Sequence, residues 1–155
     1  MISGESIIQL DTNCLIALSN ASSSTGAALL KWLADGGSLQ VSIMAWAEFQ
    51  CGGPGGLRLE EDAAARTAID VVLSPTETEA ELAARLFNAT GRRSRSLADC
   101  LIAACAMQAD VLLVTENRDD FQPFLEHGLR LAELESLISG FLRPEIGDQP
   151  TSPPL

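Results

Sequence analysis

The segment Ile7-Ile-Gln-Leu-Asp-Thr-Asn13 joins a short apolar run to three consecutive polar residues. The apolar run is rich in β-branched residues, which favours a strand over residues 7–10. The side chains of Asp11, Thr12 and Asn13 can each accept hydrogen bonds from free backbone amides, as is typical of a helix N-terminus. We therefore predict a strand that passes directly into a helix, with Asp11 at the junction.

The alternation of strand and helix continues along the chain. Further strands are predicted at residues 39–42, 69–73 and 111–114. Helices are predicted at residues 14–19, 24–35 (capped by Ser24 or Thr25), 43–50, 60–68, 77–90 and 96–108, the last two opened by the capping boxes Thr76-x-x-Glu79 and Ser96-x-x-Asp99. Residues 51–56 form a glycine-rich break inside the domain, and residues 115–120 a polar loop. Short strands that alternate with helices imply an α/β fold, a parallel sheet covered on both faces.

The length of 155 residues suits one domain. We expect this domain to span residues 1–142 and a proline-rich, disordered tail to occupy residues 143–155. No run approaches the ~18 uninterrupted apolar residues of a membrane span, and the first residues lack a basic region followed by an apolar one. We therefore expect a cytoplasmic protein with no membrane partner.

The chain is strongly acidic, with 21 acidic residues against 10 basic ones and a formal net charge of −11. This excess argues against broad, sequence-independent adhesion to nucleic acid. It suits either a basic partner or cations held at an acidic site. The four cysteines lie among apolar stretches without a Cys-x-x-Cys pair, and His127 is the single histidine, so we predict buried thiols and no structural zinc.

Four acids fall near the predicted carboxyl edge of the sheet, where function gathers in parallel α/β folds. They are Asp11 after the first strand, Glu48 in the helix after the second, Asp99 in the first turn of the helix leading to the last strand, and Asp120 beyond that strand. Each acid also has a purely structural interpretation. Asp11 and Asp99 can serve as helix-capping residues, Glu48 can lie on a solvated helix face, and Asp120 can belong to a loop with Asp119.

Through these acids and their neighbours, the chain resembles the PIN domain family of metal-dependent nucleases, and within it the VapC-like toxins of bacterial toxin–antitoxin pairs. The matching blocks are Leu10-Asp-Thr-Asn13, Ala47-Glu-Phe49, Leu97-Ala-Asp-Cys-Leu-Ile-Ala-Ala104 and Val114-Thr-Glu-Asn-Arg-Asp-Asp-Phe121, within residues 7–131. The last block matches the pattern T-x-N-x-x-D-F, which places its final acid at Asp120 rather than Asp119. The resemblance implies a three-layer α/β/α sandwich with a short central parallel sheet.

The resemblance further implies a site, a cofactor and partners. The implied catalytic and metal-binding residues, which would hold one or two Mg²⁺ or Mn²⁺ ions, are Asp11, Glu48, Asp99 and Asp120. The polar positions that would steady the acids or metal-bound water are Thr12, Asn13, Thr115 and Asn117. The implied activity is endonucleolytic cleavage of RNA as a toxin. The implied partners are an antitoxin that inserts a basic segment among the acids and a second copy in a homodimer.

General chemistry agrees with this implied site. Mg²⁺ prefers oxygen ligands and is usually held by one or two carboxylates together with substrate phosphate, and a metal-bound water becomes a nucleophile near neutral pH. His127 lies outside every matching block, which disfavours histidine-based acid–base chemistry. Arg92, Arg93 and Arg95 precede the helix that bears Asp99 and form either a solvated turn or contacts to RNA phosphates.

Two other functions stay open. A PIN-like module without catalysis would bind RNA or protein, although the presence of all four acids argues against it. A phosphotransferase of the haloacid dehalogenase type also places an Asp after its first strand. That family needs a second Asp two positions on, where this chain has Asn13, and a downstream lysine, whereas the only lysine is Lys31.

Overall fold

A single four-stranded sheet forms the centre of the molecule. The computed structural model describes residues 6–92 and 96–139 of the chain. The sheet has the order β3-β2-β1-β4, and each of its three strand pairs is parallel. The strands are β1 (Ile7–Leu10), β2 (Ser38–Ser42), β3 (Val71–Leu73) and β4 (Leu112–Val114). The carboxyl ends of the four strands therefore lie at one edge of the sheet.

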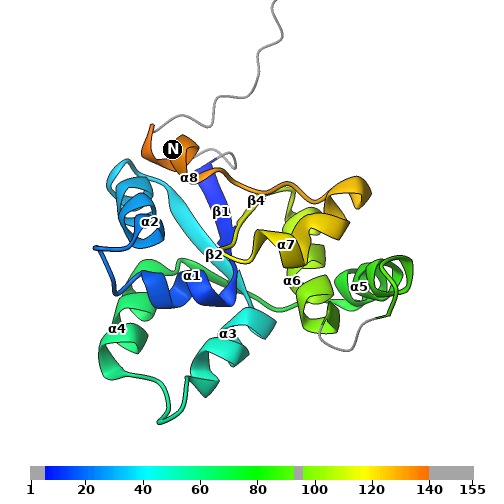
Figure 1. Cartoon of the computed structure of the whole chain (residues 1–155), viewed down its shortest axis with the longest axis horizontal. Coiled ribbons are helices and arrows are strands. Elements are labelled where there is room, and N and C mark those ends of the chain that lie inside the picture. The colour runs from blue at the N-terminus through cyan, green and yellow to red at the C-terminus, as the bar shows by residue number, and fades with distance from the viewer. Residues whose placement is uncertain (1–5, 93–95, 140–155) are drawn as a thin grey trace, which may run out of the picture.

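Helices cover both faces of this sheet. They are α1 (Thr12–Ala17), α2 (Ser24–Ala34), α3 (Ile43–Cys51), α4 (Leu59–Ala68), α5 (Glu77–Ala89), α6 (Ser96–Ala109), α7 (Arg118–Phe121) and α8 (Leu134–Ile138), with the 3-10 helix η2 (Gln122–His127) after α7. Figure 1 shows α1, α2 and α4 on one side of the strands and α5, α6 and α7 on the other. The predicted α/β fold with a parallel sheet between helical layers is confirmed. None of the helices in the described ranges is long and apolar enough to cross a membrane.

The sheet interior is apolar because parallel strands are buried on both faces. Ile8, Leu10 and Val41 are all 0% exposed. Two amides interrupt this pattern in the central strands, since Gln9 is 0% and Gln40 5% exposed. The core thus combines an ordinary hydrophobic interior with a polar pair at its centre.

Local signals set the helix starts. Asp11 is the N-cap of α1, and Ser42 is the N-cap of α3, where its hydroxyl accepts from the Ala45 N–H at 3.2 Å. The predicted capping box at Thr76 is present, with the Thr76 N–H donating to Glu79 at 2.8 Å. These caps satisfy amide groups that have no partner within the helix. They also fix where each helix leaves the carboxyl edge of the sheet.

The structure corrects several element boundaries. The first helix begins at Thr12 rather than Cys14, and the N-cap of α2 is Ser23, whose hydroxyl accepts from the Gly26 N–H at 2.9 Å. The predicted loop at residues 115–120 contains the start of α7, and neither η2 nor α8 was predicted. The predicted tail at residues 143–155 lies outside the described residues, as does the Ser96 side chain, on which the second capping box depends.

One prediction about the cysteines is wrong. Cys14, Cys100 and Cys105 are buried, but Cys51 is exposed. Cys51 is the last residue of α3, and the chain turns there into the glycine-rich segment. An apolar pattern in the sequence therefore overstated the burial of this thiol.

Candidate active site

Asp11 is the most buried acid at the carboxyl edge of the sheet, with 5% of its surface exposed. Its Oδ1 accepts a hydrogen bond from the Thr12 N–H at 2.7 Å, and its Oδ2 accepts from the Thr115 hydroxyl at 2.8 Å. Burial raises the pKa of Asp11, and the hydrogen bonds from Thr115 and Thr12 oppose this rise. Both carboxylate oxygens are therefore held in fixed directions by groups that follow β1 and β4.

The backbone between β1 and β4 fixes the place of this carboxylate. The Asp11 N–H donates to the Val114 carbonyl at 2.9 Å. The Cys14 thiol donates to the same carbonyl, with Sγ 3.4 Å from the oxygen. Burial raises the pKa of the Cys14 thiol, so the group stays protonated and acts as a weak hydrogen-bond donor rather than a metal ligand.

Glu48 approaches this centre from α3. Its Oε1 lies 3.4 Å from the Thr12 hydroxyl, a long hydrogen bond from the first residue of α1. Partial burial raises the pKa of Glu48, and the charge of Asp11 raises it further. The Glu48 residue is otherwise exposed, so its carboxylate borders both the buried Asp11 and the solvent.

Asp99 is half-buried in the first turn of α6. Burial raises its pKa to about 7, and the charges of Asp11, Asp120 and Glu48 add to this rise in that order. A carboxyl group responds to like charges only when they lie close to it. Four acids from four separate segments therefore share one electrostatic environment.

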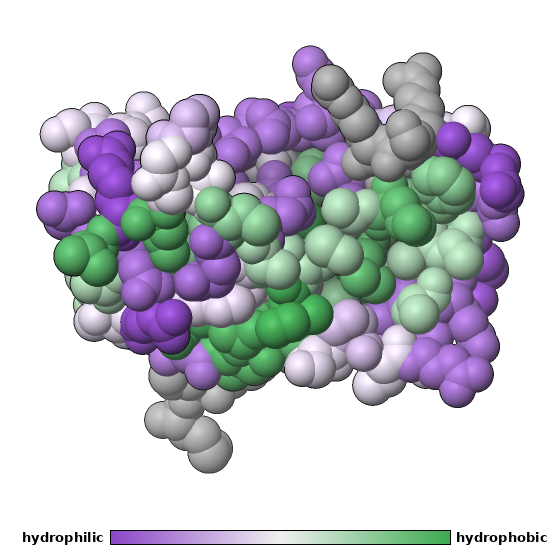
Figure 2. Space-filling model, turned by 90° about the horizontal axis from the view of Figure 1, so that it is seen from below, coloured by the Kyte–Doolittle hydropathy of each residue, from purple (hydrophilic) through white to green (hydrophobic). Residues whose placement is uncertain are grey.

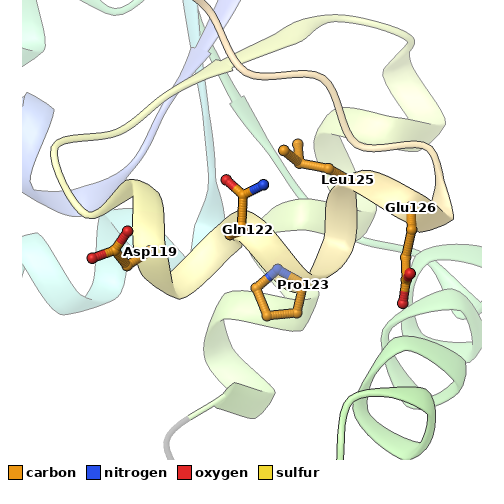
Figure 3. Close-up of a pocket in the computed structure, with 5 residues that line it drawn as sticks. All are labelled: Asp119, Gln122, Pro123, Leu125 and Glu126. Carbon is orange, nitrogen blue, oxygen red and sulfur yellow. The ribbon is translucent and has the colours of Figure 1, made fainter.

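Asp120 belongs to this group of acids, whereas its neighbour Asp119 lies elsewhere on the surface. Asp120 lies in α7, where its N–H donates to the Asn117 carbonyl at 3.1 Å, and its charge raises the pKa of both Asp11 and Asp99. Asp119 lines a separate surface pocket, whose other lining residues are Gln122, Pro123, Leu125 and Glu126. Figure 3 shows Asp119 and Glu126 at opposite ends of this pocket.

The polar residues expected around the acids have different surroundings. Thr115 is 8% exposed, and besides donating to Asp11 its hydroxyl accepts from the Asn117 N–H at 3.0 Å. Asn117 is the N-cap residue of α7, although its side chain makes no capping bond. Asn13 is half-buried in the first turn of α1.

Glu116 is a neighbouring acid that falls outside the sequence patterns described above. Its charge raises the pKa of both Asp11 and Cys14. Glu116 lies two residues after the end of β4, so the rule that selected Asp11, an acid just beyond a buried strand, could have found it. A fifth acid therefore contributes to the field at this edge.

Of the three arginines, the structure places only Arg92. Its guanidinium lies over the Phe87 ring, 5.5 Å from the centroid, and donates to the Asn88 side chain of α5. Arg92 also has a positive φ of 56°, which only a minority of residues with a side chain adopt. Arg93 and Arg95 lie outside the described residues.

The donor set suits a hard divalent cation, because the gathered side chains offer carboxylate oxygens only. In the described part of the chain, no group of three or more His, Cys, Asp or Glu side chains is arranged to hold a metal ion. Mg²⁺, however, commonly uses one or two protein carboxylates and keeps several waters. Asp11 and Asp99 are the two candidates for such a pair, because the charge of Asp11 raises the pKa of Asp99 and the charge of Asp120 raises the pKa of both.

The surface around the acids includes exposed apolar side chains. Ile43 begins α3 just after β2 and is 41% exposed, and Leu97, two residues before Asp99, is 51% exposed. Figure 2 views the molecule from below and shows hydrophobic residues across the middle of that face, with hydrophilic residues at its flanks. Apolar surface of this kind is typical of a protein interface.

Solved structures with a similar fold include two VapBC proteins and a further toxin–antitoxin complex. VapBC2 from Rickettsia felis, solved bound to a DNA fragment from its promoter, gives a TM-score of 0.63 at 21% identity, covering 81% of this chain and 97% of that chain. VapBC-1 from nontypeable Haemophilus influenzae gives 0.62 at 22% identity, covering 83% and 98%. A toxin–antitoxin complex from Klebsiella pneumoniae gives 0.55 at 22% identity, covering 74% and 89%. The comparison with curated proteins gave no match.

The family match is independent of these structures. A model of the PIN domain matches residues 8–123, a range that contains Asp11, Glu48, Asp99 and Asp120. The range covers most of the 155 residues, and of the four strands it leaves out only Ile7 at the start of β1. The chain therefore belongs to the PIN domain family.

Proposed function

We propose that this protein is a metal-dependent endoribonuclease that acts in the cytoplasm as the toxin of a toxin–antitoxin pair. The observation that carries the proposal is the shared field of four acids, since Asp11, Asp120 and Glu48 all raise the pKa of Asp99. Membership of the PIN family and the fold shared with VapBC proteins support the assignment. The proposed nuclease domain spans residues 1–142.

The proposed metal ligands are Asp11, Glu48, Asp99 and Asp120, which would hold one or two Mg²⁺ or Mn²⁺ ions. Bound there, the ion would activate a water as nucleophile and stabilise the negative charge that builds on the phosphate. The residues of the chain prepare this site before any ion binds. Thr115 and the Thr12 N–H hold the two oxygens of Asp11 in place, so that little reorganisation is needed.

Asp99 would supply the pH response of the site. Its pKa of about 7 leaves it roughly half protonated at neutral pH, and it would give up its proton on holding a cation. Thr12, Asn13 and Asn117 would orient the acids or the water bound to the metal. Arg92, Arg93 and Arg95 would contact RNA phosphates, which for Arg92 requires its guanidinium to leave Phe87 and Asn88.

A cleavage assay on labelled RNA with Mn²⁺ and with EDTA tests the activity. Cleavage should require the metal and should fall by more than about 100-fold in Asp120→Asn, because loss of a ligand should exceed the roughly 10–100-fold effect of outer-shell changes. Asp119→Asn is the matched control, since Asp119 lines the outer pocket, and it should stay active. An inactive Asp119→Asn beside an active Asp120→Asn would show that the last acid is assigned to the wrong residue.

The alternative is a PIN-like module that binds RNA or protein without cleaving it. RNA binding with no cleavage under any metal condition would favour that alternative. The haloacid dehalogenase interpretation loses its remaining support, because Lys31 lies on α2 in an ion pair with Asp35 at 2.7 Å. The PIN family match further argues against it.

Two partners are proposed besides RNA. A cognate antitoxin would insert an Arg or Lys among the acids, where a positive charge relieves their repulsion, and a second copy would form a homodimer. The similar VapBC structures and the exposed apolar residues near the site support these partners. Sedimentation velocity should show a dimer at micromolar concentration, and a heavier complex when the product of the adjacent reading frame is added. A monomer that the second protein leaves unchanged would contradict both partners.

A further inference from the structure

Two glutamine side chains occupy the centre of the sheet, where parallel strands are normally apolar. Gln9 and Gln40 are register partners on β1 and β2, and they are 0% and 5% exposed. The Gln40 Nε2 donates to the Gln9 Oε1 at 3.1 Å, and the Gln9 Nε2 donates to the Ile102 carbonyl at 2.8 Å. A continuous chain of hydrogen bonds therefore runs from β2 through β1 to α6.

This chain of hydrogen bonds sets the position of α6 along β1. Gln9 lies two residues before Asp11, so both side chains project to the same face of the strand. Ile102 lies three residues after Asp99, so the two residues are neighbours on one side of α6. The bond between Gln9 and Ile102 thus joins the two segments that present Asp11 and Asp99.

Asp11 and Asp99 are displaced in the same direction from the hydrogen bond between Gln9 and Ile102. The helix α6 leads directly into β4, which is parallel to β1, so α6 runs antiparallel to β1. From Gln9 to Asp11 the strand advances about 6.6 Å. From Ile102 back to Asp99 the helix advances about 4.5 Å the same way, and helical side chains lean further toward the N-terminus. The bond therefore holds Asp99 opposite Asp11.

Stability alone gives no reason for amides at these positions. A buried amide loses its hydration, and the hydrogen bonds that replace this hydration return only a small net contribution to stability. Apolar side chains of the same shape would fill the space about as well. Amides provide direction instead, because only a donor at Gln9 can fix the Ile102 carbonyl at one point of the strand.

We infer that Gln9, itself oriented by Gln40, is a positioning residue that sets the spacing between the carboxylates of Asp11 and Asp99. This inference rests on the proposed function, because the spacing matters only if the two acids share a cation. It predicts that the affinity of the site for a divalent cation depends on the amide pair. The protein can remain folded without that pair.

The double variant Gln9→Met/Gln40→Met separates positioning from folding. Replacing both partners by apolar groups of similar shape is close to neutral for stability, and the Ile102 carbonyl keeps its place in the helical hydrogen-bond pattern. We expect the melting temperature of the metal-free protein to change little. The dissociation constant for Mn²⁺ alone, measured by calorimetry, should rise by about 10–100-fold, as for other outer-shell changes.

Two further variants make the test independent of stability. Gln40→Met keeps the donor to Ile102 but loses the group that orients it, and should weaken Mn²⁺ binding less than the double variant. Leu29→Ala removes a fully buried side chain of α2, which covers the other face of the sheet from α6 (Figure 1). It should lower the melting temperature while leaving Mn²⁺ affinity within about twofold, well inside a tenfold step of 1.4 kcal/mol.

The outcomes distinguish the inference from the proposed function. Weaker Mn²⁺ binding in the glutamine variants but not in Leu29→Ala supports the positioning role. Unchanged Mn²⁺ affinity in a folded glutamine variant overturns the positioning role and leaves the nuclease proposal standing. An equal loss of Mn²⁺ affinity in Leu29→Ala has the same consequence. Absence of Mn²⁺ binding in the unsubstituted protein overturns the proposed function, and the positioning role with it.

Discussion

Asp99→Asn should stabilise the metal-free protein at pH 8, although it removes a proposed metal ligand. In the folded chain the pKa of Asp99 is raised from 3.8 to about 7, chiefly by burial and then by the charges of Asp11, Asp120 and Glu48. A group whose pKa is higher in the folded state than in the unfolded state destabilises the fold at every pH at which it is ionised in the unfolded state. Asparagine has a similar shape and carries no charge, so the substitution removes this penalty.

The expected stabilisation follows from the size of the pKa shift of Asp99. Each pKa unit corresponds to about 1.4 kcal/mol, so a fully buried group would contribute about 4 kcal/mol. Asp99 is only half-buried, and solvent screening reduces the penalty to about 2 kcal/mol. Loss of a negative charge in the first turn of α6 offsets about 0.5 kcal/mol. The net gain of about 1.5 kcal/mol corresponds to a rise of about 3–6 °C in melting temperature for a chain of this size.

Thermal unfolding of the EDTA-treated proteins between pH 4 and pH 8 is the assay. Near pH 4 Asp99 is protonated in the folded state and about half protonated in the unfolded state, so the two proteins should differ little. The penalty should grow between pH 4 and pH 7 and be complete above pH 7, so the advantage of Asp99→Asn should increase over that interval. Added Mn²⁺ should stabilise the unsubstituted protein more than the variant and reduce the advantage.

Asp119→Asn is the control for a general charge effect. It changes the net charge by the same amount as Asp99→Asn, but at a residue that lines the separate surface pocket. It should show no comparable increase between pH 4 and pH 7. If Asp99→Asn lowers the melting temperature at pH 8 by an amount that does not vary with pH, Asp99 is not part of a cluster of acids. The site would then lose its main electrostatic support.

Three further predictions test other parts of the structure. Mn²⁺ affinity measured by calorimetry should rise about tenfold from pH 6 to pH 8, because the cation displaces the proton of Asp99, whose pKa is about 7; a flat profile would show that Asp99 is not a ligand. Thr115→Val removes the hydroxyl that donates to Asp11 at 2.8 Å and should lower the free energy of unfolding in urea by about 1.5–3 kcal/mol at pH 8. The loss should be smaller at pH 4, where Asp11 is closer to neutral, and a loss independent of pH would contradict a bond to the charged form. Gly52→Ala should lower the melting temperature clearly, since Gly52 has a φ of 67° and an added Cβ would lie 2.3 Å from the backbone of Gly56; Gly53→Ala, where no atom lies within 4 Å of the added Cβ, is the matched control.

The long elements of the fold could be predicted because local and tertiary signals agree in them. The segment at residues 7–13 combines an apolar strand with a capping acid, and Asp11 does cap α1. The helix α7 escaped prediction because it has only four residues and its N-cap residue Asn117 makes no side-chain bond. The β-branched run predicts a strand from Ile69, but Ile69 is the C-cap of α4, and the strand starts at Val71.

The acids of the candidate site could be predicted where the sheet topology alone fixes their position. Asp11 and Asp120 were placed at one edge by the rule for parallel strands, and their charges do act on Asp99. The contact between Gln9 and Ile102 spans 93 positions, and no periodic pattern encodes it. In the sequence, Gln9 is a single polar residue within an apolar run, and one such residue does not change the prediction of a strand.

A cation and a basic side chain can each relieve the electrostatic repulsion between the acids of this site. The acids at the carboxyl edge raise one another's pKa values, so the metal-free site is destabilised at neutral pH, and any bound positive charge relieves that repulsion. Mg²⁺ or Mn²⁺ would relieve it and enable cleavage, whereas an Arg or Lys from an antitoxin would relieve it and occupy the same space. If both use these carboxylates, each must weaken the binding of the other by the same factor. Under the proposed function, the electrostatic feature that recruits the cofactor would therefore also make the nuclease open to inhibition by a basic peptide.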